Sequence, residues 1–137
     1  MPDREAVIAA NRGFYRAFES LELEQMEKVW IREQRIVCIH PGWPKLVGWG
    51  PIMNSWARIF DGVFEMKFEL GEIDVIISGD LAVVIVEENL EQKNYDGIMR
   101  SQVLTTNIFE RAGGEWLMVS HHGSPVLAPA GSEPQLQ

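Results

Sequence analysis

The three histidines are the side chains of this sequence best suited to acid–base chemistry, and they occupy two short segments. His40 precedes Pro41, and His121 and His122 precede Gly123. An imidazole titrates near neutral pH, so it can take or give a proton when a neighbour orients it. Both segments are predicted to end β-strands, because proline and glycine interrupt a strand. Since strand ends often carry functional side chains, we expect one pocket to contain both segments.

His40 supports two interpretations. It would be the general base of a catalytic site, or it would form a structural hydrogen bond at the Pro41-Gly42 turn. Cys38, on the same strand face, is expected to be a small buried hydrophobe, because no nearby cation would stabilise its thiolate. We expect no metal and no cofactor, because the histidines have no cysteine or carboxylate at ligand spacing and the chain has no glycine-rich phosphate loop.

Asn107 and the histidine pair fall on the two strands of a predicted final hairpin. Asn107 shares strand parity with Thr105 and therefore faces the same side of the sheet. A buried amide needs partners, so Asn107 would polarise a substrate carbonyl or make a structural hydrogen bond. Pairing around the turn at 112–115 places His121 beside Thr105, on the face of Asn107, and His122 on the opposite face. A bulge would reverse this assignment, so both histidines are ligand-binding candidates.

Aromatic residues supply the expected apolar walls of the pocket. Trp43, between Gly42 and Pro44, would cover an apolar ligand at the rim. Most of the other aromatic residues are expected in the core. The aromatic candidates for ligand contact are Tyr15, Trp43, Trp56 and Phe60. The acidic residues between 87 and 96, Glu88 among them, are expected on a solvated edge and loop.

Three helices are predicted in the first half of the chain. Apolar residues at helical spacing follow a possible N-cap at Asp3 and predict a helix to about Glu19. A short helix is expected over 22–31 and a strand over 35–40. A third helix begins at Gly50-Pro51, where proline suits the first turn, and ends near Gly62.

The second half is predicted to be β-structure. Apolar residues occupy even positions from 64 to 70 and odd positions from 73 to 77, so we expect a bulge at Gly71 that bends the strand. Strands over 81–86, 98–110 and 116–122 follow, with a polar loop over 88–97, and the apolar run 81–86 is expected to be covered on both faces. This order of elements gives an α+β fold with the helices on one side of a bent sheet.

Composition indicates a soluble protein. The chain has 137 residues, of which 46% are hydrophobic, and a net charge of −8 that argues against nucleic acid or an anionic membrane as a partner. One cysteine, no signal-peptide core and no apolar stretch of about 18 residues predict a cytoplasmic location. We divide the chain into a single domain over 1–125 and a flexible tail over 126–137.

The order of the elements, together with the segments 38–44 and 120–125, resembles the SnoaL-like branch of the nuclear transport factor two-like superfamily. Residues 106–111 and 113–116 look like its final hairpin, and the resemblance covers residues 5–125. It implies a cone in which a strongly bent, mainly antiparallel sheet wraps around three helices, with a pocket at the wide end. It also implies a homodimer that forms through the sheets.

Apolar residues on both faces of the last strands favour the same homodimer, because the helices can cover only one face. By strand parity, one face carries Leu104, Ile108, Trp116 and Met118. The other face carries Val103, Phe109, Leu117 and Val119.

The ketosteroid isomerases of this superfamily allow a comparison by position. His40-Pro41 takes the place of their Asp-Pro general base, and Asn107 takes the place of their second Asp. Their helical Tyr falls at Phe14 or Tyr15, and the spacing favours Phe14. Steroid isomerisation is therefore not expected. The kinase association domains carry Arg at the Asn107 position, so an anion held there is not expected either.

Three classes of function are consistent with these residues. The first is a cofactor-free enzyme for proton transfer, cyclisation or dehydration of an apolar carbonyl compound, with His40 as base and Asn107 and His121 stabilising charge. The second is a binding module for a small apolar ligand. The third is an oligomerising interaction domain with a pocket filled by its own side chains. Whether the protein is an enzyme stays open at this point.

Overall fold

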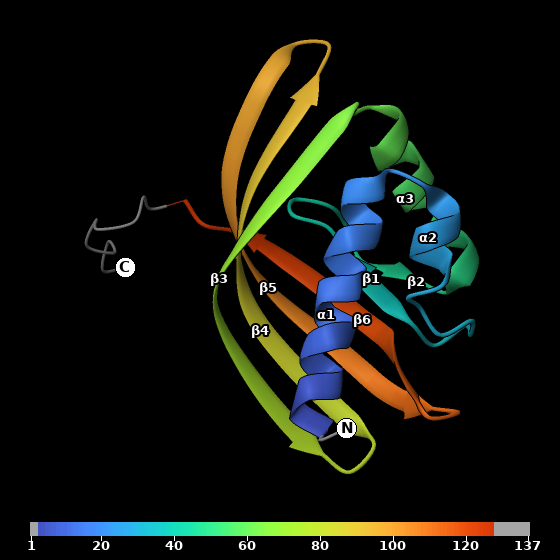
Figure 1. Cartoon of the computed structure of the whole chain (residues 1–137). Helices are drawn as coiled ribbons and strands as arrows, with labels where there is room; N and C mark the ends of the chain where they lie inside the picture. Colours follow the sequence, from blue (N-terminus) through green and yellow to red (C-terminus); the bar gives the residue numbers. More distant parts are fainter. Residues whose placement is uncertain (1–2, 128–137) are drawn as a thin grey trace.

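The computed structural model describes residues 3–127, in which a bent six-stranded sheet curves around three helices (Figure 1). The helices are α1 Asp3–Ser20, α2 Leu23–Glu27 and α3 Trp49–Asp61. The strands are β1 Val37–Ile39, β2 Leu46–Val47, β3 Glu65–Ser78, β4 Leu81–Asn94, β5 Gly97–Ala112 and β6 Glu115–Pro125. The α+β fold class is confirmed.

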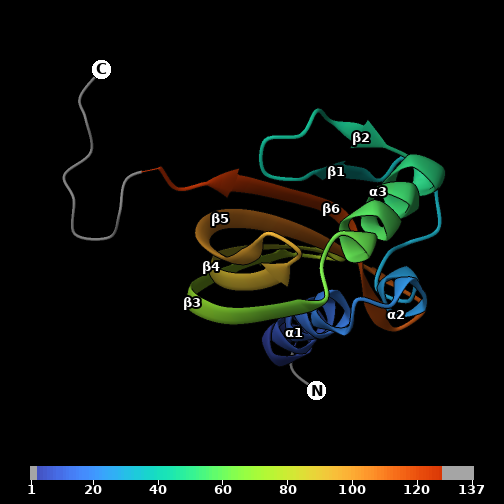
Figure 2. The ribbon, with the colours of Figure 1, turned by 90° about the horizontal axis from the view of Figure 1, so that it is seen from above.

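The sheet has the strand order β2-β1-β6-β5-β4-β3. All neighbouring strands are antiparallel except β1 and β6, which pair in parallel. The sheet curls so that its concave face receives the helices, as the view from above shows (Figure 2). Because β1 lies beside β6, the end of β1 at Ile39 is brought next to His122. The two histidine segments are therefore neighbours in space.

The bend in β3 lies at Gly71, as the change of parity predicts. Leu70 pairs with Glu88 but Ile73 pairs with Val86, so β3 contains one extra residue between them. A Cβ atom on Gly71 would lie 3.2 Å from the Cβ of Glu87, which leaves little room for a side chain there. The bulge keeps the apolar side chains of both halves of β3 on the concave face.

The predicted polar loop over 88–97 is wrong. β4 continues to Asn94, and only the tight turn at Tyr95-Asp96 separates it from β5. The backbone of this segment is paired with β3 on one side and β5 on the other. The strand could not be recognised from its apolar pattern, because its side chains are polar and its backbone pairing does not depend on them. Glu88 is therefore part of the sheet and is buried, in contrast to the solvated position expected.

Two further differences concern the ends of elements. α2 ends at Glu27 because the next residues turn to pair with β6, where the Ile31 amide donates to the Met118 carbonyl at 3.0 Å. β6 extends to Pro125. Residues 128–137 of the predicted tail lie outside the described part of the chain, and the division at residue 125 stays a prediction.

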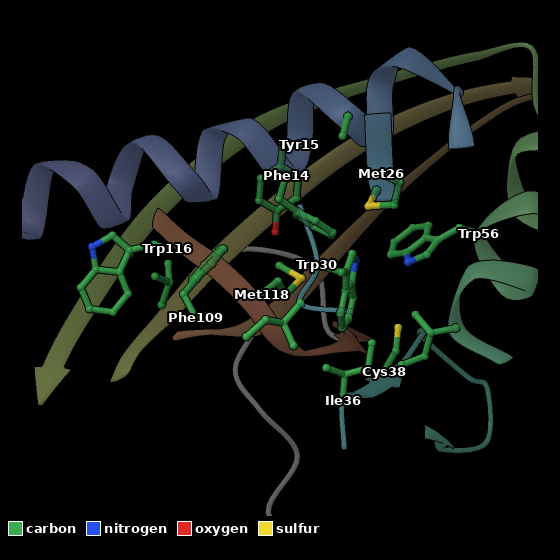
Figure 3. Close-up of a cluster of buried hydrophobic side chains, with 14 of the residues drawn as sticks. Phe14, Tyr15, Met26, Trp30, Ile36, Cys38, Trp56, Phe109, Trp116 and Met118 are labelled. Atoms are coloured by element: carbon green, nitrogen blue, oxygen red, sulfur yellow. The ribbon is translucent and has the colours of Figure 1, made fainter. Parts of the chain in front are cut away.

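The core lies between the helices and the concave face of the sheet (Figure 3). Phe14 of α1 and Trp56 of α3 are fully buried there, as are Phe109 and Met118 of the last hairpin. Phe109 pairs with Met118. The predicted division of the apolar residues by parity is therefore wrong for the hairpin. Its concave face carries Val103, Phe109, Trp116 and Met118, and its convex face carries Leu104, Ile108 and Leu117.

Candidate functional site

A cavity of about 480 Å³ opens between α3, the turn after β1 and one end of the sheet. At that end lie the start of β3, the second half of β4, the first half of β5 and the end of β6. Its wall contains three buried titratable residues, His40, Glu88 and His121. A larger concavity of about 640 Å³ lies against β3, β4 and β5, but none of the residues that line it is buried. Because burial shifts the pKa of a titratable side chain, the smaller cavity with its three buried titratable residues is the candidate site.

His40 follows β1 and is held by α3 in one orientation. Its Nε2 lies 2.8 Å from the Ser55 Oγ, and the Ser55 hydroxyl donates to the Ile52 carbonyl at 2.6 Å. The single hydroxyl proton is used by Ile52, so Nε2 carries the imidazole proton and Nδ1 keeps its lone pair. The ring also packs edge-on against Trp56 and Trp43, at centroid distances of 4.7 and 4.9 Å. Burial lowers the pKa of His40 to about 4, so the ring is neutral at pH 7.

Asn107 orients the second imidazole. Its Nδ2 donates to the Asn11 Oδ1 at 2.9 Å and to the Tyr15 hydroxyl at 3.3 Å. Its Oδ1 lies 2.7 Å from the His121 Nδ1, so Nδ1 carries the proton of the neutral ring and Nε2 keeps the lone pair. Burial, followed by the charges of His40 and His122, lowers the pKa of His121 to about 3. Both imidazoles of the wall are therefore neutral acceptors at pH 7.

A bulge in β6 turns His121 toward the concave face. Phe109 pairs with Met118 but Ile108 pairs with Ser120, so Val119 is the extra residue. His121 therefore pairs with Asn107, and the predicted pairing of His121 with Thr105 is wrong, because Thr105 pairs with Gly123. The pairing of Ala112 with Glu115, continued without the extra residue, would place His122 and not His121 opposite Thr105. In the structure His121 is 2% exposed, and His122 lies exposed on the convex face.

Glu88 is the functional candidate that the sequence analysis missed. The carboxylate is only 3% exposed, lines the cavity and accepts a short hydrogen bond from the Tyr15 hydroxyl. Burial raises the pKa of Glu88, and the hydrogen bond from Tyr15 opposes that rise. A signal was present, because Glu88 continues the alternation of the buried residues Val84 and Val86. It was overlooked because the strand was expected to end at residue 86.

Tyr15, and not Phe14, places a hydroxyl in this network. Burial and then the charge of Glu88 raise the pKa of Tyr15 well above its usual value, so the phenol stays protonated and donates. Phe14 packs its ring against His121 instead, at a centroid distance of 4.9 Å. Tyr15 lies behind Glu88 and is not itself part of the cavity wall.

The predicted site residues divide into two groups. His40, Trp43 and His121 line the cavity, with Trp43 at its outer end. The other candidates, Tyr15, Trp56, Phe60, Asn107 and His122, do not contribute to its wall. Four of these are buried behind the wall, where Trp56 and Asn107 pack against the lining histidines, and His122 faces outward.

The arrangement places one acidic group of raised pKa and two neutral imidazoles around an otherwise largely apolar space. A carboxylate in such surroundings is a stronger base than one in water, and its protonated form can return the proton. Within residues 3–127 no three His, Cys, Asp or Glu side chains are grouped as metal ligands. No helix in the same range is long and apolar enough to cross a membrane.

The chain matches a known domain family and resembles solved structures. Residues 7–129 match the SnoaL-like domain family. The crystal structure of a proposed dehydratase of the NTF2-like family from Streptomyces avermitilis is 34% identical, with a TM-score of 0.85 over 90% of this chain and 96% of that one. A proposed calcium/calmodulin-dependent protein kinase type II association domain from Thiobacillus denitrificans is 32% identical, with a TM-score of 0.77 over 86% and 93%.

The F-box protein SKIP8 of Arabidopsis thaliana is 30% identical over 122 residues, which make up 89% of this chain and 50% of that protein. This chain therefore spans about half the length of that relative. The TM-scores of 0.85 and 0.77 show that the two solved structures share the fold of this chain. The chain belongs to the SnoaL-like domain family, within the NTF2-like superfamily.

Proposed function

We propose that the cavity binds a small, mainly apolar carbonyl compound and that Glu88 moves a proton within it without a cofactor. The observation that carries this proposal is a carboxyl group of raised pKa in the cavity wall, held by the Tyr15 hydroxyl. A general base works best when its pKa lies near the working pH, and burial moves Glu88 in that direction. His40, with a pKa of about 4, is the weaker base of the two at pH 7.

The reaction needs only groups that the cavity supplies. The Glu88 carboxylate takes a proton from the carbon next to the carbonyl, and the electron pair moves to the carbonyl oxygen to give an enolate. The protonated Glu88 then returns the proton to another carbon, which gives an isomer, or to a departing hydroxyl group, which leaves as water. The likeness to a proposed dehydratase at 34% identity supports the second outcome. The neutral His121 and His40 would accept hydrogen bonds from hydroxyl groups of the substrate.

Exchange of carbon-bound hydrogen in D₂O tests this assignment without knowledge of the natural substrate. The probe is 2-tetralone, an apolar ketone with an acidic α-carbon, followed by NMR. We expect the wild-type protein to accelerate exchange above the buffer rate and Glu88→Gln to lower the acceleration by roughly 10²–10⁴-fold. His40→Gln is expected to retain most of it. The assignment is wrong if Glu88→Gln exchanges like wild type, and loss in His40→Gln alone would make His40 the base.

A non-catalytic binding module is the second candidate, because the cavity and its apolar wall serve binding equally well. Saturable binding of the ketone without any exchange would favour it. An open space of about 480 Å³ speaks against an interaction domain whose pocket is filled by its own side chains.

We also propose that two copies of the chain pair through the convex face of the sheet. Exposed apolar side chains occur there on the two strands that flank β4, with Ile76 of β3 59% and Leu104 of β5 48% exposed. Half-buried apolar residues lie between them on the same face, namely Val83, Ile85 and Ile108. A contiguous apolar surface of this kind is uncommon on a monomer, and a second copy of the same sheet would cover it.

A further inference from the structure

The outer end of the cavity carries a single cationic side chain. Of the described residues that line the cavity, Arg58 of α3 is the one Lys or Arg. Its guanidinium carbon lies 5.3 Å from the centroid of the Trp43 ring, and Trp43 packs against His40 of the inner wall. The indole face therefore holds the guanidinium at the exposed rim of the cavity.

The donors of this guanidinium are not used within the described chain. Among residues 3–127, the ion pairs formed by arginine involve Arg35, Arg100 and Arg111, and none involves Arg58. The side-chain hydrogen bonds of that range do not include Arg58 either. A guanidinium presents five N–H donors in a planar fork that matches an oxyanion such as a carboxylate.

The two charged groups of the cavity wall differ in depth and in sign. Glu88 is 3% exposed at the inner end, and Arg58 is exposed at the outer end. Both imidazoles are neutral at pH 7, because burial lowers the pKa of His40 to about 4 and that of His121 to about 3. An anionic group on a ligand would therefore be repelled by Glu88 and attracted by Arg58. An apolar body would occupy the space between them.

We infer that Arg58 binds an oxyanion at the mouth of the cavity, so that the ligand is an apolar compound with a carboxylate or a similar anionic group at one end. This inference rests on the proposed function, because it names the substrate class of the same cavity. It also assigns Arg58 a role in orientation, since the anionic end at the mouth directs the opposite end of the ligand toward Glu88. The net charge of −8 makes this local attraction important for admitting an anion at all.

Two fluorescent probes that differ only in a sulfonate test the inference. They are 1-anilinonaphthalene-8-sulfonate, which is anionic, and N-phenyl-1-naphthylamine, its neutral parent. We expect Arg58→Gln to weaken binding of the anionic probe by about five- to tenfold, a charge-assisted hydrogen bond reduced by solvent screening, and to leave the neutral probe unchanged. Arg58→Lys should restore part of the loss, and added salt should weaken only the anionic probe.

Arg32→Gln is the matched control, because Arg32 stacks on Trp49 at 4.8 Å and neither residue lines the cavity. It should leave both probes unchanged. Equal binding of the anionic probe by wild type and Arg58→Gln would overturn the inference while leaving the proposed function in place. So would an equal loss of both probes, since Arg58 would then act by supporting Trp43. If neither probe binds, or if filling the cavity by Val103→Trp displaces neither, both the inference and the proposed function are wrong.

Discussion

Removal of the Tyr15 hydroxyl tests the central hydrogen bond of the site. Tyr15 donates to a carboxylate that is 3% exposed, so Tyr15→Phe leaves a buried acceptor without its donor. A hydrogen bond to a charged group contributes about 1.5–3 kcal/mol, whereas a neutral one contributes about 1 kcal/mol. The cost of the substitution should therefore depend on whether Glu88 is ionised.

The sign follows from the pKa of Glu88, which burial raises above its usual 4.5 in the folded protein. A group of raised folded pKa contributes stability below its unfolded pKa, and this contribution is lost as the pH rises through the folded pKa. Tyr15→Phe removes a bond that favours the ionised form, so it raises the pKa of Glu88 further. We expect a cost of about 2–3 kcal/mol at pH 8 and about 1 kcal/mol at pH 4, where Glu88 is protonated.

Urea denaturation of wild type and variant at the two pH values measures this difference. Titration of the histidines affects both proteins, so it cancels when the two are compared at one pH. Tyr95→Phe is the matched control, because Tyr95 is the second tyrosine of the chain and is 91% exposed. It should cost almost nothing at either pH. An equal cost of Tyr15→Phe at pH 8 and pH 4 would show that this hydrogen bond does not depend on the ionisation of Glu88. A cost at pH 8 no larger than that of the control would show that the bond contributes nothing to stability.

Two further predictions concern the buried histidine and the convex face. Burial lowers the pKa of His40 from 6.5 to about 4, so its contribution to stability is present above pH 6.5 and is lost as the pH falls toward 4. His40→Gln should therefore remove roughly 2–3 kcal/mol of the loss of stability that acid causes, as measured by urea denaturation over this pH range. His122→Gln, at an exposed position, should not. Equal slopes of unfolding free energy against pH for the two variants would contradict this prediction. Leu104→Arg should convert a dimer to a monomer in sedimentation velocity, and Val47→Arg, at a position equally exposed at 48% on the edge strand β2, should not; a wild-type monomer at tens of micromolar, an order-of-magnitude working concentration for a weak dimer, would count against the proposed pairing.

The elements with a strong periodic pattern could be predicted from the sequence. The helical stripe of α1, the proline at the start of α3 and the change of parity at Gly71 each have a direct physical cause. The position of His40 at the end of a strand and its approach to His121 were also expected from the sequence. The ring centroids of the two histidines lie 6.1 Å apart in the structure. The features of α1, α3 and β3 depend on local chain geometry, whereas the approach of His40 to His121 depends on the pairing of β1 with β6.

The features that were missed depend on pairing between distant strands. The bulge at Val119 has no glycine to mark it, in contrast to the bulge at Gly71, so the register of β6 could not be fixed from the hairpin turn alone. The distal half of β4 has polar side chains and is held by backbone bonds to both neighbours. Glu88 was lost from the candidate site for that reason, because a residue assigned to a loop is not expected to be buried.

A direct measurement of the pKa of Glu88 tests whether this carboxyl group can transfer a proton in the cavity. A ¹³C NMR titration of protein labelled at the glutamate carboxyl group, with Glu88→Gln used to assign the resonance, gives this value in the intact chain. Glu88 should titrate clearly above 4.5, and Tyr15→Phe should raise the pKa of Glu88 further. A Glu88 that titrates at or below 4.5, as an exposed carboxylate does, would contradict the assignment of Glu88 as the proton-transferring group of the cavity.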